Sequence, residues 1–189
     1  MLQNALEPRP ETFELLGRTR NSAAVPALAA GLLAPEMQVR AKCVQLLLGR
    51  KEVAAARRAI VSEWTRFDAA TREQLASSKG GLERACKAVL GNGSHSHQQA
   101  VITAICDLDM TAALPELIGL ALDPNNPIRD TAMAAIFELC DRWGQRARQG
   151  QDVPSVRAPM LETMQRAIYD FSSHRNFELI DAWLMLVCW

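Results

Sequence analysis

The sequence predicts an all-α protein built from antiparallel helix pairs, and three observations support this prediction. Alanine, leucine, arginine, glutamine and glutamate dominate the 189 residues, whereas runs of β-branched and aromatic residues are scarce, which favours helix over strand. No segment alternates apolar and polar residues over the length of a strand. One stretch of the chain also matches a later stretch at a fixed offset, as expected of a helical-repeat protein.

Composition places the chain among globular proteins without a membrane span. Its 49% hydrophobic residues exceed what a disordered chain carries, and its 21 basic and 21 acidic residues cancel. The longest apolar stretch without a charge, residues 21–35, is shorter than the ~20 residues of a transmembrane helix. The N-terminus has no basic region followed by an apolar one, so we expect no secretory signal. Five cysteines without CxxC spacing then predict a cytoplasmic protein with reduced thiols.

Turn-forming prolines, glycines and asparagines divide the chain into segments long enough for helices of one to two dozen residues. We predict helices over residues 10–19, 22–34, 36–49, 52–67, 69–78, 82–91, 97–108, 111–122, 126–144, 155–172 and 176–188. Ser22 and Thr111 precede apolar helices and are predicted N-caps, because a hydroxyl accepts a hydrogen bond from a free backbone N–H. Pro26 and Pro115 then fall near the first turn, where a missing N–H costs little.

Residues 22–47 and 111–136 align without a gap when Thr111 is placed over Ser22. The two copies are offset by 89 residues, and half of this offset is about 44 residues, the length of one two-helix repeat. In the second helix of each copy, apolar residues recur with helical periodicity and predict a buried stripe. These stripes are Val39, Cys43, Leu46 and Leu47 in the first copy, and Ile128, Ala132, Ile136 and Leu139 in the second. Since a short helix pair cannot bury its stripe alone, neighbouring pairs must stack.

Val101–Cys140 resembles a HEAT repeat with a preceding helix attached. The resemblance rests on Leu114, Pro115 and Leu117 in the first helix, Asp123 and Pro124 in the turn, and Ile128, Arg129 and Ala132 in the second helix. Ser22–Leu47 is similar at Pro26, Pro35, Val39 and Arg40, but has Ala34 in place of the turn aspartate. The resemblance implies a right-handed α-solenoid of the HEAT or armadillo type. It also implies that Asp123 and Arg129 belong to ladders of polar contacts along the stack.

We predict a single HEAT-like domain over residues 1–189. The clearer repeats span 11–50 and 100–140, a degenerate repeat spans 52–91, and a divergent helical pair spans 155–188. The final apolar run contains Leu184, Leu186, Val187 and Trp189, without a residue that commonly ends a helix. Because a terminal repeat normally has a polar outer face, we expect a bare stacking face there and a chain that continues into a longer protein.

No pattern in the sequence predicts catalysis, cofactor binding or a metal site. His95 and His97 have a chelating spacing but no third ligand nearby, and the adjacent serines fit a helix cap better. The motifs GxSxG, GxGxxG and GxxxxGK[ST] are absent, and no cysteine has a neighbouring histidine to act as its base. Three cysteines fall on apolar helix faces, where we expect a buried and inert thiol: Cys43, Cys106 and Cys140.

The zero net charge hides a polarised chain, because basic residues outnumber acidic ones in 1–91 and the reverse holds in 92–189. Four basic residues near Trp64 and Phe67 could contact nucleic-acid phosphates: Lys51, Arg57, Arg58 and Arg66. A solvated helix face with Trp64 in the core is the simpler interpretation. The other tryptophans are also expected to pack in the core or between repeats: Trp143, Trp183 and Trp189.

We interpret the chain as a non-enzymatic interaction or scaffold module that binds a protein or peptide along the concave face of the solenoid. Positions opposite the buried stripes would line this groove: Lys42, Gln45, Lys87, Thr131 and Glu138. Their change of charge along the groove would fix the direction of the ligand. Nucleic-acid binding by the basic half is the alternative. A third interpretation, from resemblance to some bacterial HEAT-like proteins, is a regulatory or lyase-associated domain that acts on a cofactor-bearing protein.

Overall fold

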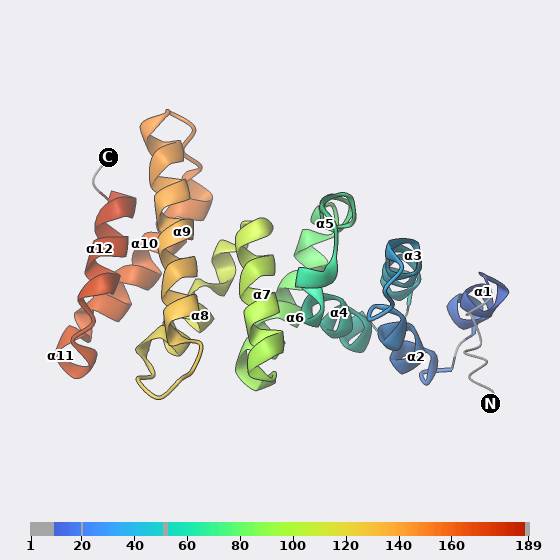
Figure 1. Ribbon diagram of the computed structural model, residues 1–189. Helices are drawn as coiled ribbons and strands as arrows, with labels where there is room; N and C mark the ends of the chain where they lie inside the picture. The colour runs from blue at the N-terminus through green and yellow to red at the C-terminus, as the bar shows by residue number, and fades with distance from the viewer. Residues whose placement is uncertain (1–9, 20, 51–52, 188–189) are drawn as a thin grey trace. The chain divides into compact units, whose positions relative to one another are not determined.

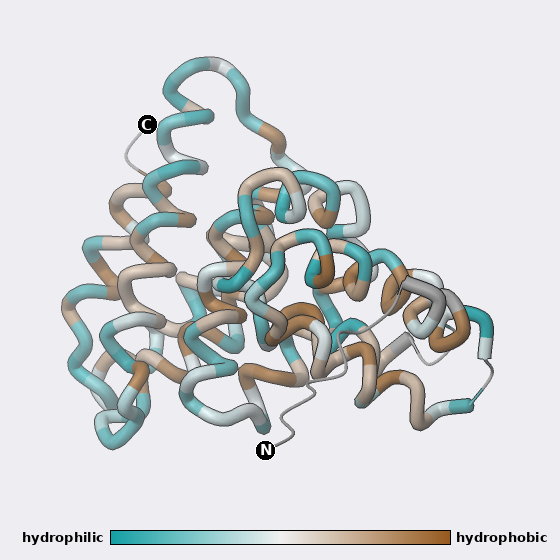
Figure 2. The backbone as a smooth tube through the Cα atoms, turned by 45° about the vertical axis from the view of Figure 1, so that its right-hand side comes forward, coloured by the Kyte–Doolittle hydropathy of each residue, from teal (hydrophilic) through white to brown (hydrophobic). Residues whose placement is uncertain are grey.

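All regular secondary structure is helical in the part of the chain that the computed structural model describes, residues 10–19, 21–50 and 53–187. This result confirms the predicted all-α class (Figure 1). Hydrophobic and hydrophilic residues are interleaved along the helices, as amphipathic packing requires (Figure 2). None of the described helices combines the length and the apolar composition needed to cross a membrane.

The chain divides into two compact units, Met1–Ala85 and Cys86–Trp189, where the sequence predicts one domain. The first unit contains α1 (Pro10–Arg18), α2 (Ala24–Gly31), α3 (Met37–Leu48), α4 (Val53–Ser62), the 3₁₀ helix η1 (Trp64–Arg66) and α5 (Ala69–Ala76). The boundary falls inside α6 (Lys79–Asn92). The second unit continues with α7 (His95–Asp107), η2 (Thr111–Ala113), α8 (Leu114–Leu122), α9 (Arg129–Arg148), α10 (Pro154–Tyr169), α11 (Phe171–His174) and α12 (Phe177–Val187).

In the first unit, α2 and α3 pack against each other and both contact α1 and α4. Their shared core includes Leu28, Cys43 and Leu47, all nearly inaccessible to solvent. A Cβ atom at Gly31 would overlap the sulfur of Cys43, so α2 approaches α3 at a point where only glycine fits.

In the second unit, α9 packs against α7, α8 and α12. Small buried residues such as Ala132, Ala135 and Gly144 let neighbouring helices approach α9 closely. The shorter α10 packs against α8, η2, α11 and α12. The second unit is therefore built around α9, its longest helix.

The two copies of the internal repeat form equivalent helix pairs, α2–α3 and α8–α9, each joined by a short turn. Aligned residues have the same burial: Val25 and Leu114, Leu28 and Leu117, Cys43 and Ala132, and Leu47 and Ile136. The stripe predicted on α9 is buried in full. On α3, Val44 is buried, whereas Val39 and Leu46 are only half-buried.

The predicted N-caps Ser22 and Thr111 are wrong. The residue before α2 is Ala23, whose N–H donates to the side chain of Asn21, so Asn21 closes this turn one residue earlier than predicted. Thr111 lies inside η2, and no side chain caps α8. Both helices begin in continuous right-handed turns, which leaves no extended residue whose hydroxyl could reach back to a free N–H.

Three predicted helices also differ in extent. The helix predicted over 52–67 ends at Ser62 and is followed by η1, and the helix predicted over 155–172 ends at Tyr169 before the separate α11. Conversely, α6 begins at Lys79 and runs through the predicted break at Gly80 and Gly81. A Cβ atom at Gly81 would overlap the guanidinium of Arg57, which donates to the Gly81 carbonyl at 2.9 Å. This glycine makes room for a contact rather than a turn.

Arginine side chains satisfy backbone carbonyls at helix C-termini and in the turns that follow. The buried Arg50 donates to the Leu16 carbonyl at the end of α1, and Arg129 donates to the Ala121 carbonyl at the end of α8. Arg40 donates to the carbonyls of Ala34 and Pro35 in the turn after α2. The aligned Arg40 and Arg129 therefore do the same work in both repeats, since each closes the turn between its two helices.

We expect Leu28→Ala to lower the free energy of unfolding by about 2–5 kcal/mol, because it leaves a cavity in a fully packed site. The matched change Leu33→Ala, at a side chain that is 51% exposed, should alter it by less than about 0.5 kcal/mol. Urea denaturation followed by circular dichroism measures both. Equal losses from the two variants would contradict the assignment of Leu28 to the core.

Candidate interaction surface

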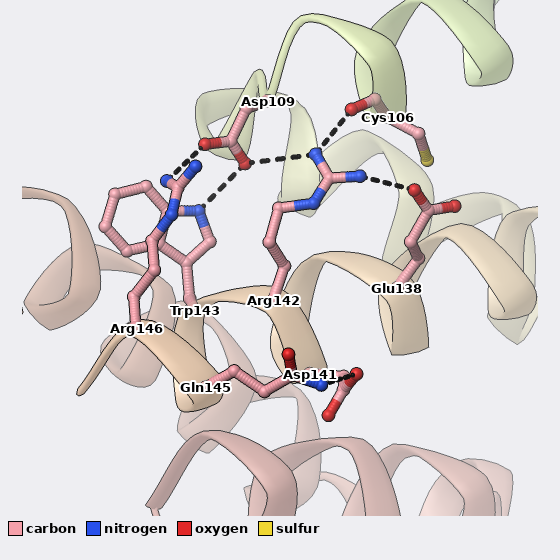
Figure 3. Close-up of polar contacts among 8 residues, drawn as sticks. All are labelled: Cys106, Asp109, Glu138, Asp141, Arg142, Trp143, Gln145 and Arg146. Carbon is pink, nitrogen blue, oxygen red and sulfur yellow. Dashed lines mark hydrogen bonds and ion pairs between the residues drawn. The ribbon is translucent and has the colours of Figure 1, made fainter. Parts of the chain in front are cut away.

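A cluster of polar residues joins the end of α7 to α9 (Figure 3). Asp109 follows α7 with a left-handed backbone, φ 54°. Its carboxylate accepts hydrogen bonds from Nε1 of Trp143 at 2.9 Å and from Nη1 of Arg146 at 2.7 Å. Nη1 of Arg142 lies 3.6 Å from the same carboxylate and donates to the Cys106 carbonyl at the end of α7. One carboxylate is thus shared by two hydrogen-bond donors and a third, ion-paired side chain, all on α9.

Two further contacts involve the arginines of the cluster. Glu138 accepts a hydrogen bond from the second terminal nitrogen of Arg142. The Arg146 guanidinium carbon lies 4.6 Å from the centre of the Trp143 ring, which adds a cation–π contact. Because the charged groups of Asp109, Arg142 and Arg146 are used within the cluster, its role is to hold α7 against α9.

The buried cysteines have the environment of inert thiols. Burial raises the pKa of Cys43 to about 11 and that of Cys140 to about 12. The pKa of Cys106 is raised to about 12, first by burial and then by the charge of Glu138. The predicted burial of these three thiols is confirmed, and Cys86 is buried as well. No group of three or more potential metal ligands occurs in the described ranges.

The predicted groove residues fall into different surroundings. Lys42 and Gln45 are exposed on α3 in the first unit. Thr131 and Glu138 are exposed on one side of α9 in the second unit. Lys87 is half-buried, and its ammonium lies 3.7 Å from Oε1 of Glu116 on α8. Lys87 and Glu138 therefore already have partners within the chain, the latter in Arg142.

Of the basic residues proposed to contact nucleic acid, Arg58 and Arg66 are exposed and Arg57 is half-buried. Arg57 donates to the Gly81 carbonyl, Arg66 is paired with Glu63, and Arg58 is exposed on α4. Lys51 lies outside the described residues. The two aromatic side chains that could stack on bases are buried, Trp64 at 0% and Phe67 at 4% exposure, in agreement with the simpler interpretation of this region.

The other three tryptophans differ in their surroundings. Trp143 is buried and forms part of the cluster around Asp109, as the packing prediction requires. Trp183 is half-buried on α12. Trp189 lies outside the described residues, so the prediction for it is left as it stands.

The outer face of α12 exposes apolar residues at helical spacing. Phe177 is 67% exposed and Leu184 is 40% exposed, and Ile180 and Val187 are half-buried beside them. We call these four residues the α12 strip. The opposite face of the helix, with Leu179, Ala182 and Leu186, is fully buried in the second unit. Of the residues named for the predicted stacking face, Leu184 is exposed, Val187 is half-buried and Leu186 is buried, while Trp189 lies outside the described residues.

Two acidic residues lie along one edge of the α12 strip. Glu178 and Asp181 are exposed and one helical turn apart, on the edge away from Ile180 and Val187. Neither carboxylate has a hydrogen-bond or ion-pair partner among the described residues. The α12 strip is therefore an apolar row with one anionic edge.

The turn before α12 holds the strip in place. Arg175 adopts a left-handed conformation, φ 49°, which reverses the chain between α11 and α12. Nδ1 of His174 accepts from the backbone N–H of Asn176 at 3.1 Å, and its Nε2 lies 2.9 Å from the Ala167 carbonyl. An N–H only donates and a carbonyl only accepts, so the proton of this imidazole is on Nε2. Phe171 then packs edge-on against Phe177, with ring centres 4.9 Å apart.

Two surface hollows are lined by small and apolar residues. One of about 350 Å³ lies between α1 and α2, and one of about 280 Å³ lies between α8 and α10 beside Pro115 and Pro159. Among the described residues, neither lining contains an ionisable side chain. The described part of each lining therefore offers no general acid, base or nucleophile of the ionisable kind.

Comparison of the chain with known protein families, with curated proteins and with solved structures finds no match in any of the three. The α12 strip was only partly visible in the sequence. The terminal apolar run points to Leu184 and Val187, whereas Phe177 and Ile180 complete the row at the preceding turns. A helical wheel of residues 176–188 would have found them, since both sides of this helix are apolar.

We expect Asp109→Ala to lower the free energy of unfolding by about 2–3 kcal/mol, because it removes a partly buried acceptor of charged hydrogen bonds. Asp109→Asn should cost less, about 1 kcal/mol, because asparagine tolerates the left-handed backbone and still accepts hydrogen bonds. Urea unfolding measures the difference, with Asp181→Asn as an exposed control of the same type. If the alanine variant is as stable as the control, the cluster does not hold α7 on α9.

We expect Cys43, Cys106 and Cys140 to resist alkylation by iodoacetamide at pH 8 in the folded protein. With pKa values of about 11 and 12, the folded-state thiols stay protonated at this pH, and burial blocks the reagent. The same residues should react in concentrated urea. Mass spectrometry of tryptic peptides distinguishes the sites, and rapid labelling of any of the three in the folded chain would contradict the expectation.

Proposed function

We propose that this chain is a non-enzymatic protein-interaction module and that it binds a protein partner through the α12 strip. The observation that carries the proposal is the exposure of Phe177 and Leu184 on a helix whose other face is fully buried. Large apolar side chains that lie in a row on the surface mark sites of contact with another macromolecule. Aromatic residues such as Phe177 are also enriched where binding energy concentrates.

We further propose that α2–α3 and α8–α9 are HEAT-like repeats in a solenoid. Equal burial at the aligned positions supports this part of the proposal, as do the hydrogen bonds that the aligned Arg40 and Arg129 each donate to a carbonyl in or before the preceding turn. The turn aspartate differs from the expected pattern, because Asp123 accepts from the N–H of Asn125 and not from Arg129. In this chain, Arg129 instead donates a hydrogen bond to the carbonyl of Ala121.

The exposed positions predicted for the groove remain further contact surfaces in our proposal, each considered on its own unit. Lys42 and Gln45 on α3 and Thr131 on α9 are exposed and available to a ligand. Lys87 and Glu138 contribute less, since each would have to give up its present ion pair. Nucleic-acid binding is not favoured by a comparable observation, because Trp64 and Phe67 are buried.

Site-specific photo-cross-linking tests the proposed function. The photoreactive residue p-benzoylphenylalanine is placed at 184 on the α12 strip or at 131 in the groove, in the full chain expressed in its native cells. We expect position 184 to capture a defined protein and position 131 to capture it less efficiently. Adding Phe177→Ser to the chain labelled at 184 should reduce capture about ten-fold, because it removes an apolar anchor.

Controls separate the possible outcomes of this experiment. Chains with Phe177→Ser must keep the melting temperature of the wild type within a few degrees. Capture only from position 131 would place the interaction in the groove and not on α12. A nucleic-acid adduct, or no protein adduct from either position, would contradict the proposed function.

A further inference from the structure

We propose that the occupant of the α12 strip is an amphipathic helix of another protein that carries basic residues along one edge of its apolar row. This inference rests on the proposed function and adds the chemistry of the partner. It starts from the charge beside the strip, where Glu178 and Asp181 are exposed without partners among the described residues. Any partner that covers Phe177 and Leu184 brings its own side chains next to these carboxylates.

The spacing of the strip fits a helix. Phe177, Ile180, Leu184 and Val187 follow one another at intervals of three and four residues, so they form a nearly straight row that spans about three turns of α12. A second helix packs against such a row with its own residues at the same intervals. An extended strand would find no unpaired backbone groups on the face of α12, because these are bonded within the helix.

A second copy of this chain is a poor occupant for reasons of charge. If two α12 helices pack antiparallel about a two-fold axis that lies in their interface, the edge with Glu178 and Asp181 faces the same edge of the partner. If they pack parallel, the two carboxylates face the opposite edge, beside Ile180 and Val187, where no basic residue receives them. Each arrangement brings carboxylates against carboxylates or against apolar side chains, and both oppose association.

A basic edge on the partner resolves both difficulties. Lysine or arginine side chains opposite Glu178 and Asp181 gain ion pairs at the rim, while the apolar rows exclude water between the helices. Rim charges of this kind contribute more to specificity and to the rate of association than to affinity. The apolar row should therefore set how tightly the partner binds, and the acidic edge should set which partner binds.

Two designed peptides test the inference. Both are capped, fluorescein-labelled helices of about 20 residues with leucine at intervals of three and four. One has lysine along the edge of the leucine row, and the other has glutamate at the same positions. Binding to the full chain is measured by fluorescence anisotropy, and the oligomeric state of the chain is measured by sedimentation at the same concentrations.

We expect the wild-type chain to prefer the lysine peptide by about ten-fold, and the preference to shrink in 0.5 M salt, which screens rim charges. The double change Glu178→Lys with Asp181→Lys should reverse the preference. The double change Phe177→Ser with Leu184→Ser should abolish binding of both peptides. Circular dichroism melting confirms that each variant is folded, and Glu178→Gln with Asp181→Gln provides a milder pair that should remove the preference without reversing it.

Three results would overturn the inference. Equal binding of the two peptides, or preference for the glutamate peptide, would show that the acidic edge does not select the partner. Binding of neither peptide, together with cross-linking of a protein at position 184, would leave the proposed function standing and remove the basic amphipathic helix as the occupant. Self-association that Leu184→Ser abolishes would make a second copy the occupant.

Discussion

The backbone carbonyls at helix C-termini impose the constraint on which most of this fold depends. Each helix ends with carbonyls that have no partner within the helix, and a chain of short helices has many such ends. Here, arginine side chains from elsewhere in the chain supply the donors. Arg50 serves α1, Arg129 serves α8, Arg142 serves α7 and Arg157 serves α12, where it lies 2.7 Å from the Leu186 carbonyl. A positive charge at this position also opposes the negative end of the helix dipole, so each contact both satisfies a carbonyl and fixes one helix on another.

The same constraint changes the meaning of the basic residues in the first half of the chain. Counted along the sequence, they form an excess of positive charge that suggests a nucleic-acid surface. In the folded chain, Arg40, Arg50 and Arg57 point at backbone carbonyls, and Arg50 is only 6% exposed. A guanidinium suits this work because its several N–H groups reach more than one carbonyl at once, as Arg50 does with Leu16 and Asn21. Charge that is bonded to backbone carbonyls is less available to a ligand.

Sequence reasoning recovered what depends on local pattern and missed what depends on contact. Helix positions and the buried stripe of α9 follow from 3.6-residue periodicity, so Ile128, Ala132 and Ile136 could be assigned to the core without a structure. The role of Arg129 could not, because the repeat predicts an arginine there but not the carbonyl that it reaches. Asp109 gave no signal either, since its donors Trp143 and Arg146 lie more than thirty residues away in the chain. The break expected at Gly81 failed for a related reason, because glycine also serves where another group approaches the backbone closely.

The candidate site follows from a comparison of α12 with the other helices of its unit. On α9, polar and charged residues such as Thr131 and Glu138 occupy the side that faces away from the core. On α12, the corresponding side carries Phe177 and Leu184, so this helix is apolar on both faces. A helix of that composition is normally covered on both sides. Within the second unit, the contacts of α12 with α9 and α10 cover one side of α12, through Leu179, Ala182 and Leu186. The acidic edge formed by Glu178 and Asp181 then limits what can cover the other side, because a covering helix without basic residues would leave two carboxylates partly desolvated and unpaired.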